Sequence, residues 1–502
     1  MKAFLMYPDR DFDPDRAAPV NAAELTQDLE LGALLDAMSR GDVLLRKVTR
    51  TAVLSSLVTP GEILYRQNIL HDCLRQPLVV RSLYDLAVEA VAGEKAIFRS
   101  FFSERPETLL GRSVKVLEMF VGMLKRLRQV ADEHADEFSS EGFTRFYLML
   151  STELDDDYFA VIEHHLKRLR FHDGLLTSSR LGEGNQGIDD VLREPREQNR
   201  GFFKRVPVKK PAYSMTIPDR DDNGLRALSD LRDRGLNVVA NAAAQSADHV
   251  LSFFTALRDE LAFYVACLNL HELLVSKGEP ACFPVPTDFG ERVLSARGLY
   301  EPCLSLRLDE RATGNDLDAD GKSLIMITGA NQGGKSTFLR SVGVAQLMMQ
   351  AGMFVAAETF SASAVRALFT HYKREEDATM TSGKLDEELS RMSEIADQIS
   401  PDCLLLCSES FAATNEREGS EIAREVVRAM VDGGITVCYV THLFDLSHSL
   451  YEQHPHNALF LRAERESGGH RSYRLAEGEP LSTSYGQDLY TRTFPALIGR
   501  RE

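Results

Sequence analysis

Apolar residues recur at three- and four-residue spacing through much of the first half of the chain, the pattern of helices with one buried face. One such face follows residues 117–130, with Leu117, Phe120, Val121, Leu124, Leu127 and Val130. Another follows residues 223–276, with Val250, Phe254, Leu257, Leu261, Tyr264, Leu268, Leu273 and Leu274. Residues 21–170 and 223–276 are therefore expected to be mainly helical. The polar segment 1–20 is expected to be loose or paired at a sheet edge.

The helical spacing is interrupted between residues 171 and 218. Residues 171–177 and 181–185 look like short strands joined by Gly and Asn, which favour turns. Two short strands are expected here. The helical region 21–280 should therefore carry a small β insertion at about 171–218.

Strands and helices alternate from residue 281 to 502, after Pro280, Pro284 and Pro286. Buried strands are predicted at 323–328, 403–407 and 435–440, and helices at 336–350 and after 383. The last helix has an apolar stripe that should pack on a sheet, formed by Leu385, Leu389, Met392, Ile395 and Ile399. This alternation predicts an α/β domain with a mostly parallel sheet.

The bulk composition excludes several classes of protein. The 502 residues carry a net charge of −17, which argues against a protein that coats nucleic acid by bulk charge. The chain has no apolar run of about eighteen residues, so no membrane span is expected. Its seven cysteines include no C-x-x-C pair. Buried thiols in a reducing cytoplasm explain them better than disulfides or a zinc site.

Residues 329–336, Gly-Ala-Asn-Gln-Gly-Gly-Lys-Ser, fit the phosphate-binding pattern G-x-x-x-x-G-K-[ST] between a predicted strand and a predicted helix. The glycines let backbone N–H groups surround phosphate oxygens, and the helix N-terminus adds partial positive charge. Lys335 is expected to reach the β- and γ-phosphates, and the Ser336 hydroxyl to ligate Mg²⁺. The chain is therefore expected to bind a nucleoside triphosphate.

Residues for hydrolysis are expected at the ends of the next two strands. Glu409 follows the strand 403–407, where a carboxylate would accept a proton from the attacking water. Ser408 stands where an Asp normally helps to hold Mg²⁺, and its hydroxyl carries no charge. His442 follows the strand 435–440 and could contact the γ-phosphate or the lytic water. The order loop, strand with Glu, strand with His predicts a hydrolytic site with Glu409, His442 and Lys335 as its catalytic residues.

Two further segments each allow two interpretations. Ser382 stands at the expected start of a helix, where it could dock an anion or simply cap the helix. Residues 193–210 hold seven basic and two acidic residues, so they could meet a phosphate backbone or form a solvated loop paired with acidic surface elsewhere. The candidates for DNA contact are Arg200, Lys204, Arg205, Lys209 and Lys210.

Several short motifs share one resemblance. They are Gly314-Asn315-Asp316-Leu317, Thr328 to Thr337, Ser382-Gly383, Leu405 to Glu409, Val440-Thr441-His442 and Ser484-Tyr485-Gly486. Together they resemble the ATPase domain of MutS-type DNA mismatch repair proteins, over about 310–490. Residues 60–276 look more loosely like the helical core and lever region that precedes that domain, and 171–218 lies where the family inserts its DNA-gripping clamp.

The resemblance implies an ATPase that uses ATP and Mg²⁺, dimerises through this domain as ABC-type ATPases do, and moves helical levers around DNA. It implies that Ser382 of the other protomer closes each site. The metal residues would be Ser336 and, behind it, Ser408. The implied nucleotide contacts are Gly329, Ala330, Asn331, Gln332, Gly333, Gly334, Lys335, Ser336, Thr337 and Ser382.

The sequence also departs from that family. Ser408 replaces an Asp, which puts the rate of hydrolysis in question. Residues 411–416, Phe-Ala-Ala-Thr-Asn-Glu, replace the Gly-Arg-Gly-Thr-Ser-Thr loop through which the subunits communicate. The triplet Phe102-Ser103-Glu104 has the letters of the family's Phe-x-Glu mismatch reader but falls in a helical region, so we interpret it as chance. We therefore expect no mismatch-recognition domain, and no endonuclease-like tail after residue 490.

Taken together, the sequence predicts a P-loop, ABC-like ATPase domain at 281–502 after a helical core and lever region at 21–280. The expected function is MutS-like ATP binding and hydrolysis by a cytoplasmic homodimer that acts on duplex or branched DNA, without strong sequence specificity, in repair or recombination. One alternative is a slow-hydrolysing switch that dimerises with ATP, motivated by Ser408. The other is an ABC-like ATPase that acts on a protein partner, motivated by the acidic net charge.

Overall fold

The computed structural model describes residues 1–97, 105–172, 174–194, 214–218, 220–374, 383–453, 456–465 and 471–482. By their contacts the residues form two compact units. The first unit holds residues 1–3, 81–137 and 144–258, and the second holds residues 4–80, 138–143 and 259–502. Helices α5, α7 and α9 contribute residues to both units.

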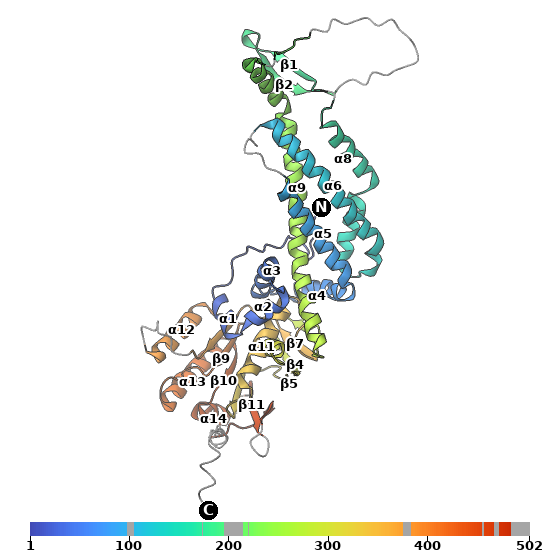
Figure 1. The fold of residues 1–502 in the computed structure, drawn as a ribbon. Coiled ribbons are helices and arrows are strands. Elements are labelled where there is room, and N and C mark those ends of the chain that lie inside the picture. Colours follow the sequence, from blue (N-terminus) through green and yellow to red (C-terminus); the bar gives the residue numbers. More distant parts are fainter. Residues whose placement is uncertain are drawn as a thin grey trace, which may run out of the picture. The chain divides into compact units, whose positions relative to one another are not determined.

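The first unit is mainly helical (Figure 1). Its elements are α5 (Pro77–Ala96), α6 (Pro106–His134), η1 (Ala135–Glu137), α7 (Glu141–Glu153), α8 (Asp156–Arg168), β1 (Thr177–Leu181), η2 (Glu183–Asn185), β2 (Gly187–Leu192) and the first part of α9 (Asp222–Ser276). The Phe120 ring on α6 stacks on the Phe254 ring on α9, with centroids 5.6 Å apart. Leu124 and Leu127, from the same predicted apolar face, are also buried. The apolar face that the three- and four-residue spacing predicts on α6 is therefore part of the core of this unit.

The β insertion is an antiparallel hairpin of β1 and β2. Its strands lie later in the chain than expected at 171–177 and 181–185, because the run from Gly182 to Gln186 forms the turn, closed by the Gly182 N–H donating to the Gln186 carbonyl. Residues 214–218 form no regular element. The candidates for DNA contact, Arg200, Lys204, Arg205, Lys209 and Lys210, lie outside the described residues, so that contact stays a prediction.

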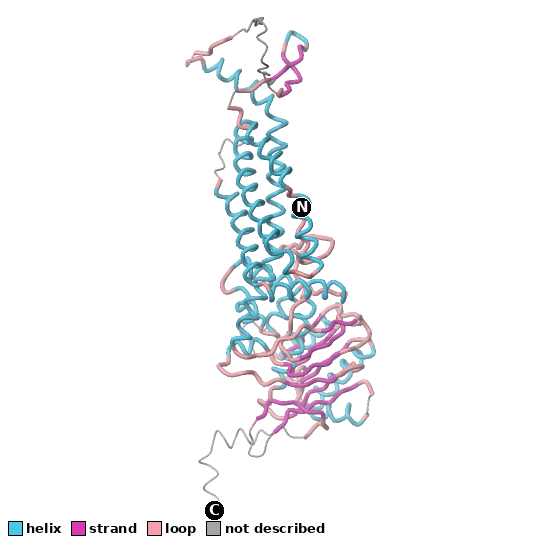
Figure 2. The backbone as a smooth tube through the Cα atoms, turned by 90° about the vertical axis from the view of Figure 1, so that its right-hand side faces the viewer, coloured by secondary structure: helices cyan, strands magenta, loops and turns pink. Residues whose placement is uncertain are grey.

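The second unit combines helices with two sheets (Figure 2). Its helices are α1 (Ala22–Asp28), α2 (Leu31–Ser39), α3 (Val43–Leu54), α4 (Pro60–Arg75), the end of α9, α10 (Pro302–Arg307), α11 (Lys335–Gln350), α12 (Lys384–Gln398), α13 (Glu416–Asp432) and α14 (Phe444–Glu452). Its strands are β3 (Val285–Thr287), β4 (Leu294–Leu299), β5 (Asn315–Asp318), β6 (Leu324–Gly329), β7 (Thr359–Ser363), β8 (Leu368–Tyr372), β9 (Leu404–Ser408), β10 (Thr436–Val440), β11 (Ala458–Arg465) and β12 (Arg471–Glu477).

The larger sheet has the strand order β12-β11-β6-β10-β9-β8. Its pairs are parallel except for β11 with β12, so the prediction of a mostly parallel sheet is confirmed for this sheet. A second, mixed sheet has the order β3-β7-β4-β5 and was not expected. Strands β3 and β5 contain three and four residues, too few for an alternating pattern to show in the sequence.

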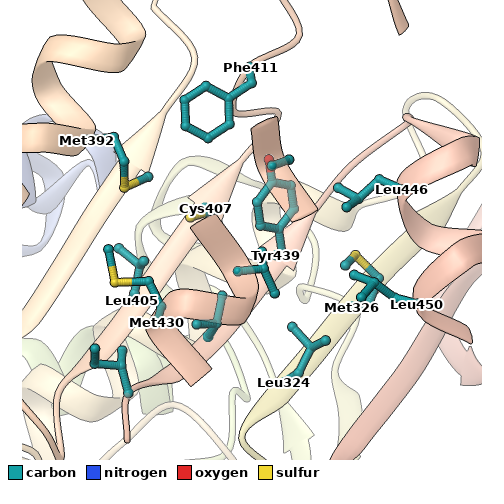
Figure 3. Packing of buried hydrophobic residues seen from close by; sticks show 14 of the residues in the cluster. Leu324, Met326, Met392, Leu405, Cys407, Phe411, Met430, Tyr439, Leu446 and Leu450 are labelled. Carbon is teal, nitrogen blue, oxygen red and sulfur yellow. The ribbon is translucent and has the colours of Figure 1, made fainter. Parts of the chain in front are cut away.

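Helices cover both faces of the larger sheet. On one face α12, α13 and α14 enclose an apolar cluster that includes Met326, Leu405 and Tyr439 (Figure 3). On the other face α11 approaches closely, because a Cβ at Gly343 would meet a Leu406 methyl group at 2.6 Å. The stripe predicted on α12 packs as expected with one exception, since Leu389 is 39% exposed.

The first part of the N-terminal segment, residues 3–7, is largely buried, so the expectation of a loose or edge-paired start is wrong there. Leu5 and Met6 have no exposed surface. The Glu260 carboxylate on α9 accepts hydrogen bonds from the Leu5 N–H at 2.6 Å and the Phe12 N–H at 3.1 Å. The contacts therefore place residues 4–80 with residues 259–502, a division that differs from the predicted boundaries at 20 and 280.

The expected burial of the cysteines is confirmed for six of the seven. All seven are free thiols. None of the described helices combines the length and apolar character that crossing a bilayer requires.

Candidate functional site

The ends of three neighbouring parallel strands bring the predicted catalytic residues together. In β10, Val440 is in register with Ile327 of β6 on one side and with Ser408 of β9 on the other. The carboxyl ends of β6, β9 and β10 therefore meet at one edge of the sheet. Ligands of open α/β sheets bind outside this edge.

The phosphate loop connects β6 to α11 at that edge. A Cβ at Gly329 would lie 2.8 Å from the Ala463 backbone nitrogen, and Gly329 has φ of 105°, so only glycine fits there. Gly334, with φ of 88°, is the N-cap of α11 and has no side chain to bond the first N–H groups of the helix. Those N–H groups and the helix dipole are left to bind an anion.

Lys335 is positioned by the loop that precedes it. Its ammonium donates to the Gly329 carbonyl and the Ala330 carbonyl, each at 3.0 Å. An ammonium has three donors, so one is left for a phosphate oxygen. Burial lowers the pKa of Lys335, and the Glu409 carboxylate opposes that shift. The loop therefore holds a desolvated cation where phosphate charge would compensate it.

Two hydroxyl groups occupy the predicted metal position. The Ser336 Oγ on α11 lies 3.3 Å from the Ser408 Oγ at the end of β9. Both are neutral oxygen donors. Mg²⁺ prefers oxygen ligands and takes many of them from water and nucleotide phosphates, so this donor set fits the ion.

Glu409 and His442 face each other next to this pair. The Glu409 Oε1 and the His442 Nδ1 are 3.7 Å apart, and the Glu409 N–H donates to the Val440 carbonyl at 2.9 Å. His442, then Lys373 and Lys335, lower the pKa of Glu409 against the effect of burial. The carboxylate therefore stays ionised and is able to accept a proton from water.

A cavity of about 700 Å³ lies on the other side of the loop. Gln332, Gly334 and Thr337 line it beside the phosphate loop. The remaining walls come mainly from residues 299–315, among them Tyr300, Glu301, Arg311 and Asn315, with Phe338 from α11 and Tyr473 from β12. Its position next to the loop suits the base and sugar of a nucleotide.

The motif Gly314-Asn315-Asp316-Leu317 organises this cavity wall. The Asn315 side chain donates to the Tyr473 carbonyl at 3.1 Å and accepts from the Leu475 N–H at 2.8 Å. Asp316 accepts from the Gly298 N–H at 2.9 Å and pairs with Arg297. The motif therefore links β5 to both β12 and β4.

Some residues near the site were missed from the sequence, and some predicted ones lie outside the described residues. Lys373 follows β8 and its charge acts on Glu409, while Arg471 at the start of β12 acts on Lys335. Only the order of the strands in the sheet reveals them. Ser382, Phe102-Ser103-Glu104 and Ser484-Tyr485-Gly486 are outside the described residues, so their roles stay predictions.

Comparison with known families matches two parts of the chain. Residues 59–277 match the family described as the MutS2 N-terminal domain. Residues 325–494 match the family described as MutS domain V, which includes the phosphate loop, Glu409 and His442.

Individual proteins that are similar to this chain also carry MutS names. The DNA mismatch repair protein MutS of Chloroflexus aurantiacus is 30% identical over 206 residues, covering 38% of this chain and 21% of that protein. The DNA mismatch repair protein MutS of Thermus thermophilus is 25% identical over 400 residues, covering 76% of this chain and 46% of that protein. The MutS protein homolog 4 of Homo sapiens is 22% identical over 350 residues, covering 67% of this chain and 36% of that protein. The aligned parts thus span less than half the length of each of these relatives.

Proposed function

This chain belongs to the MutS family, and from that premise we propose that it binds and hydrolyses ATP at the edge formed by β6, β9 and β10 and acts on DNA. The family's ATPases use ATP with Mg²⁺ and work on DNA as dimers. We propose three things for this chain: the role of each site residue, DNA as its partner, and its assembly into a dimer.

One observation carries the assignment of the site. Three motifs separated in sequence converge, since Ser336 lies 3.3 Å from Ser408 and Glu409 lies 3.7 Å from His442 at the same sheet edge. A Gly-rich turn alone would not place an ionised carboxylate beside a buried lysine. This juxtaposition of a phosphate-binding cation with a general base is what a nucleotide hydrolase needs.

The roles follow from the contacts of each side chain. The remaining N–H donor of Lys335 binds the β- and γ-phosphates, together with the N–H groups at the start of α11. Glu409 accepts the proton of the attacking water, and His442 contacts the γ-phosphate. Bound Mg²⁺ would be held by Ser336, with Ser408 behind it, and would neutralise charge on the phosphates.

The adenine and ribose would occupy the cavity beside the loop. Tyr300, Phe338 and Tyr473 offer apolar surface to a base, and Glu301 and Arg311 offer polar groups. A nucleotide spanning this cavity and the loop would bury most of its surface, as ligands of enclosed pockets do.

The test of hydrolysis is ATP turnover in the presence of Mg²⁺. Glu409→Gln should lower turnover to a small residual rate but leave nucleotide binding intact, because the amide cannot accept the proton yet has the same size. Glu421→Gln, an exposed carboxylate on α13, is the matched control. If nucleotide binds and promotes dimerisation but turnover stays negligible, the alternative of a slow switch is correct, and the neutral Ser408 is the feature that favours it.

The test of DNA action is a binding screen over plain, mismatched and branched duplexes at low salt, with and without a slowly hydrolysed ATP analogue. Binding should be stimulated by the analogue and depend little on sequence. Charge reversal of Arg200, Lys204, Arg205, Lys209 and Lys210 should weaken it. If no DNA binds or stimulates turnover, the alternative of a protein partner gains support, which the net charge of −17 favours.

We further propose an ABC-like assembly for the ATPase domain. Two copies of the chain would form a homodimer in the cytoplasm, with Ser382 of one protomer at the nucleotide of the other. Sedimentation with and without the ATP analogue tests this, since the dimer should be favoured when nucleotide is bound and lost with Ser382→Arg.

A further inference from the structure

The segment that carries Glu409 has an unfavourable backbone. Glu409 has φ of 53° and Phe411 has φ of 62°, so two of three consecutive residues with a Cβ adopt the left-handed region. Such residues persist only where the surroundings over-determine them, and they cluster at functional sites. The contacts that hold residues 409–411 therefore decide where the Glu409 carboxylate lies.

Ser410 is the centre of those contacts. It is fully buried, and its Oγ lies 2.6 Å from the His371 Nδ1 and 2.8 Å from the His371 carbonyl oxygen. Its own carbonyl accepts a hydrogen bond from the Tyr439 hydroxyl at 2.8 Å. Figure 3 shows Tyr439 beneath the segment that carries Phe411, in the cluster where β9 meets β10. The two strands beside β9 thus both hold Ser410, β8 through His371 and β10 through Tyr439.

His371 connects this residue to α12. Its Nε2 lies 3.0 Å from the Glu388 carbonyl, which can only accept, so this nitrogen carries a proton. Burial, reinforced by Arg391, lowers the pKa of His371 to about 4, so the ring is neutral near pH 7. The Nδ1 is therefore the acceptor, and the hydroxyl of Ser410 donates to it. The tautomer is therefore fixed, and the single hydroxyl proton of Ser410 is shared between the Nδ1 and the carbonyl oxygen of His371.

Phe411 completes the arrangement. Its ring is fully buried and stacks on the His371 ring, with centroids 5.5 Å apart and planes at 27°. Burial raises the pKa of the Glu388 carboxyl, and the Phe411 backbone opposes that shift. The left-handed residue 411 is thus held through its ring by His371, which also bonds Ser410.

We propose that His371, Ser410 and Tyr439 form a buried brace that positions Glu409 for water activation. The three are positioning residues, because none of them needs to touch the nucleotide. The proposal rests on the proposed role of Glu409 and adds residues for which no role follows from the sequence motifs. Weakening the brace should move the carboxylate while Lys335 and the phosphate loop remain in place.

The test is a double-mutant cycle of Ser410→Ala with Glu409→Gln, measured as kcat, KM for ATP and affinity for ADP. In the wild-type background Ser410→Ala should lower kcat about tenfold or more, since small misplacements of a catalytic group are costly. KM and ADP affinity should change less than about twofold. In the Glu409→Gln background the same substitution should have almost no effect, because the group that it positions is already inactive.

A second variant separates positioning from stability. Tyr439→Phe removes only the hydroxyl that bonds Ser410, and it should lower kcat in the same selective way. Tyr65→Phe is the matched control, because it removes a hydroxyl that donates to a backbone carbonyl, that of Phe4, in the same unit. The control should affect thermal stability without affecting kcat.

The outcomes distinguish the brace from the proposed function. If Glu409→Gln lowers turnover to a small residual rate but Ser410→Ala and Tyr439→Phe leave kcat unchanged, the brace is wrong and the hydrolytic site stands. Equal losses of kcat from Ser410→Ala in both backgrounds would also overturn the brace. If Glu409→Gln leaves turnover intact, or the protein has no turnover, the role of Glu409 fails and the brace fails with it.

Discussion

The side-chain oxygens of Ser336 and Ser408 lie 3.3 Å apart, although 72 positions separate them in the sequence. The first residue belongs to the helix after the phosphate loop, and the second ends the strand that precedes Glu409. A metal ion held by Ser336 would therefore face a second neutral hydroxyl. The strength of metal binding at this site should depend on the charge placed at residue 408.

Replacing Ser408 with Asp should strengthen metal binding. A carboxylate adds a charge to an oxygen ligand set, and ligand charge raises the affinity of hard cations. The Mg²⁺ concentration that gives half-maximal ATP turnover should fall by roughly tenfold, about 1.4 kcal/mol. Ser408→Asn is the control, since it has the size of Asp without its charge. Equal effects of the two substitutions would contradict the electrostatic explanation.

Lys335→Met should weaken nucleotide binding. The substitution keeps the apolar stem but removes a cation with a donor free for phosphate, and hydrogen bonds to charged groups contribute about 1.5–3 kcal/mol. The Kd for ATP, measured by calorimetry, should rise at least about tenfold. Lys322→Met removes a lysine that donates to the His456 carbonyl in the same unit, so it should leave the Kd unchanged. Unaltered affinity in Lys335→Met would refute the nucleotide site itself.

The pH dependence of turnover should depend on His442. The imidazole, 3.7 Å from the Glu409 carboxylate, is the largest cause of the lowered pKa of Glu409. Glu409 therefore keeps its base form to lower pH and loses it as pH falls through the lowered pKa. His442→Asn should move the acidic limb of the kcat/KM profile to higher pH, because the carboxyl then protonates earlier. A profile that loses amplitude at every pH without shifting would show that His442 does not act through Glu409.

The local chemistry of this site could be predicted from the sequence, because strand, loop and helix are adjacent in the chain. Lys335, Ser336 and Glu409 belong to short motifs with a periodic apolar run on at least one side. The order of the strands in the sheet could not be predicted in this way. Nothing in the sequence places β10 between β6 and β9, or β8 beside β9. For that reason Lys373 and His371, which reach the site from β8, could not be predicted.

Long-range burial is the other kind of information that the sequence lacks. The segment 1–20 as a whole holds many polar residues, yet Leu5 within it is bonded by Glu260, which is 255 positions away. Arg66 also contributes, since its guanidinium donates to the Met6 carbonyl at 3.2 Å and to the Ala351 carbonyl at 2.9 Å. These partners lie on helices whose own apolar spacing explains their formation but not what they contact.

Glu260 should make the stability of the protein depend on pH. Burial raises the pKa of this carboxyl from 4.5 to about 7, against the N–H groups that favour its ionised form. Its contribution to stability is therefore fully present below about pH 4.5 and is lost as pH rises through about 7, a change of roughly 3 kcal/mol at about 1.4 kcal/mol per pH unit.

Glu260→Gln does not titrate and accepts one hydrogen bond fewer, a loss of about 1 kcal/mol. Its deficit in urea unfolding relative to the wild type, about 1 kcal/mol near pH 4, should thus narrow as pH rises and reverse its sign by pH 8. Glu272→Gln, an exposed change on the same helix, should leave the wild-type dependence unaltered. A constant deficit for Glu260→Gln would mean that Glu260 has the same charge in the folded and unfolded chains over this range.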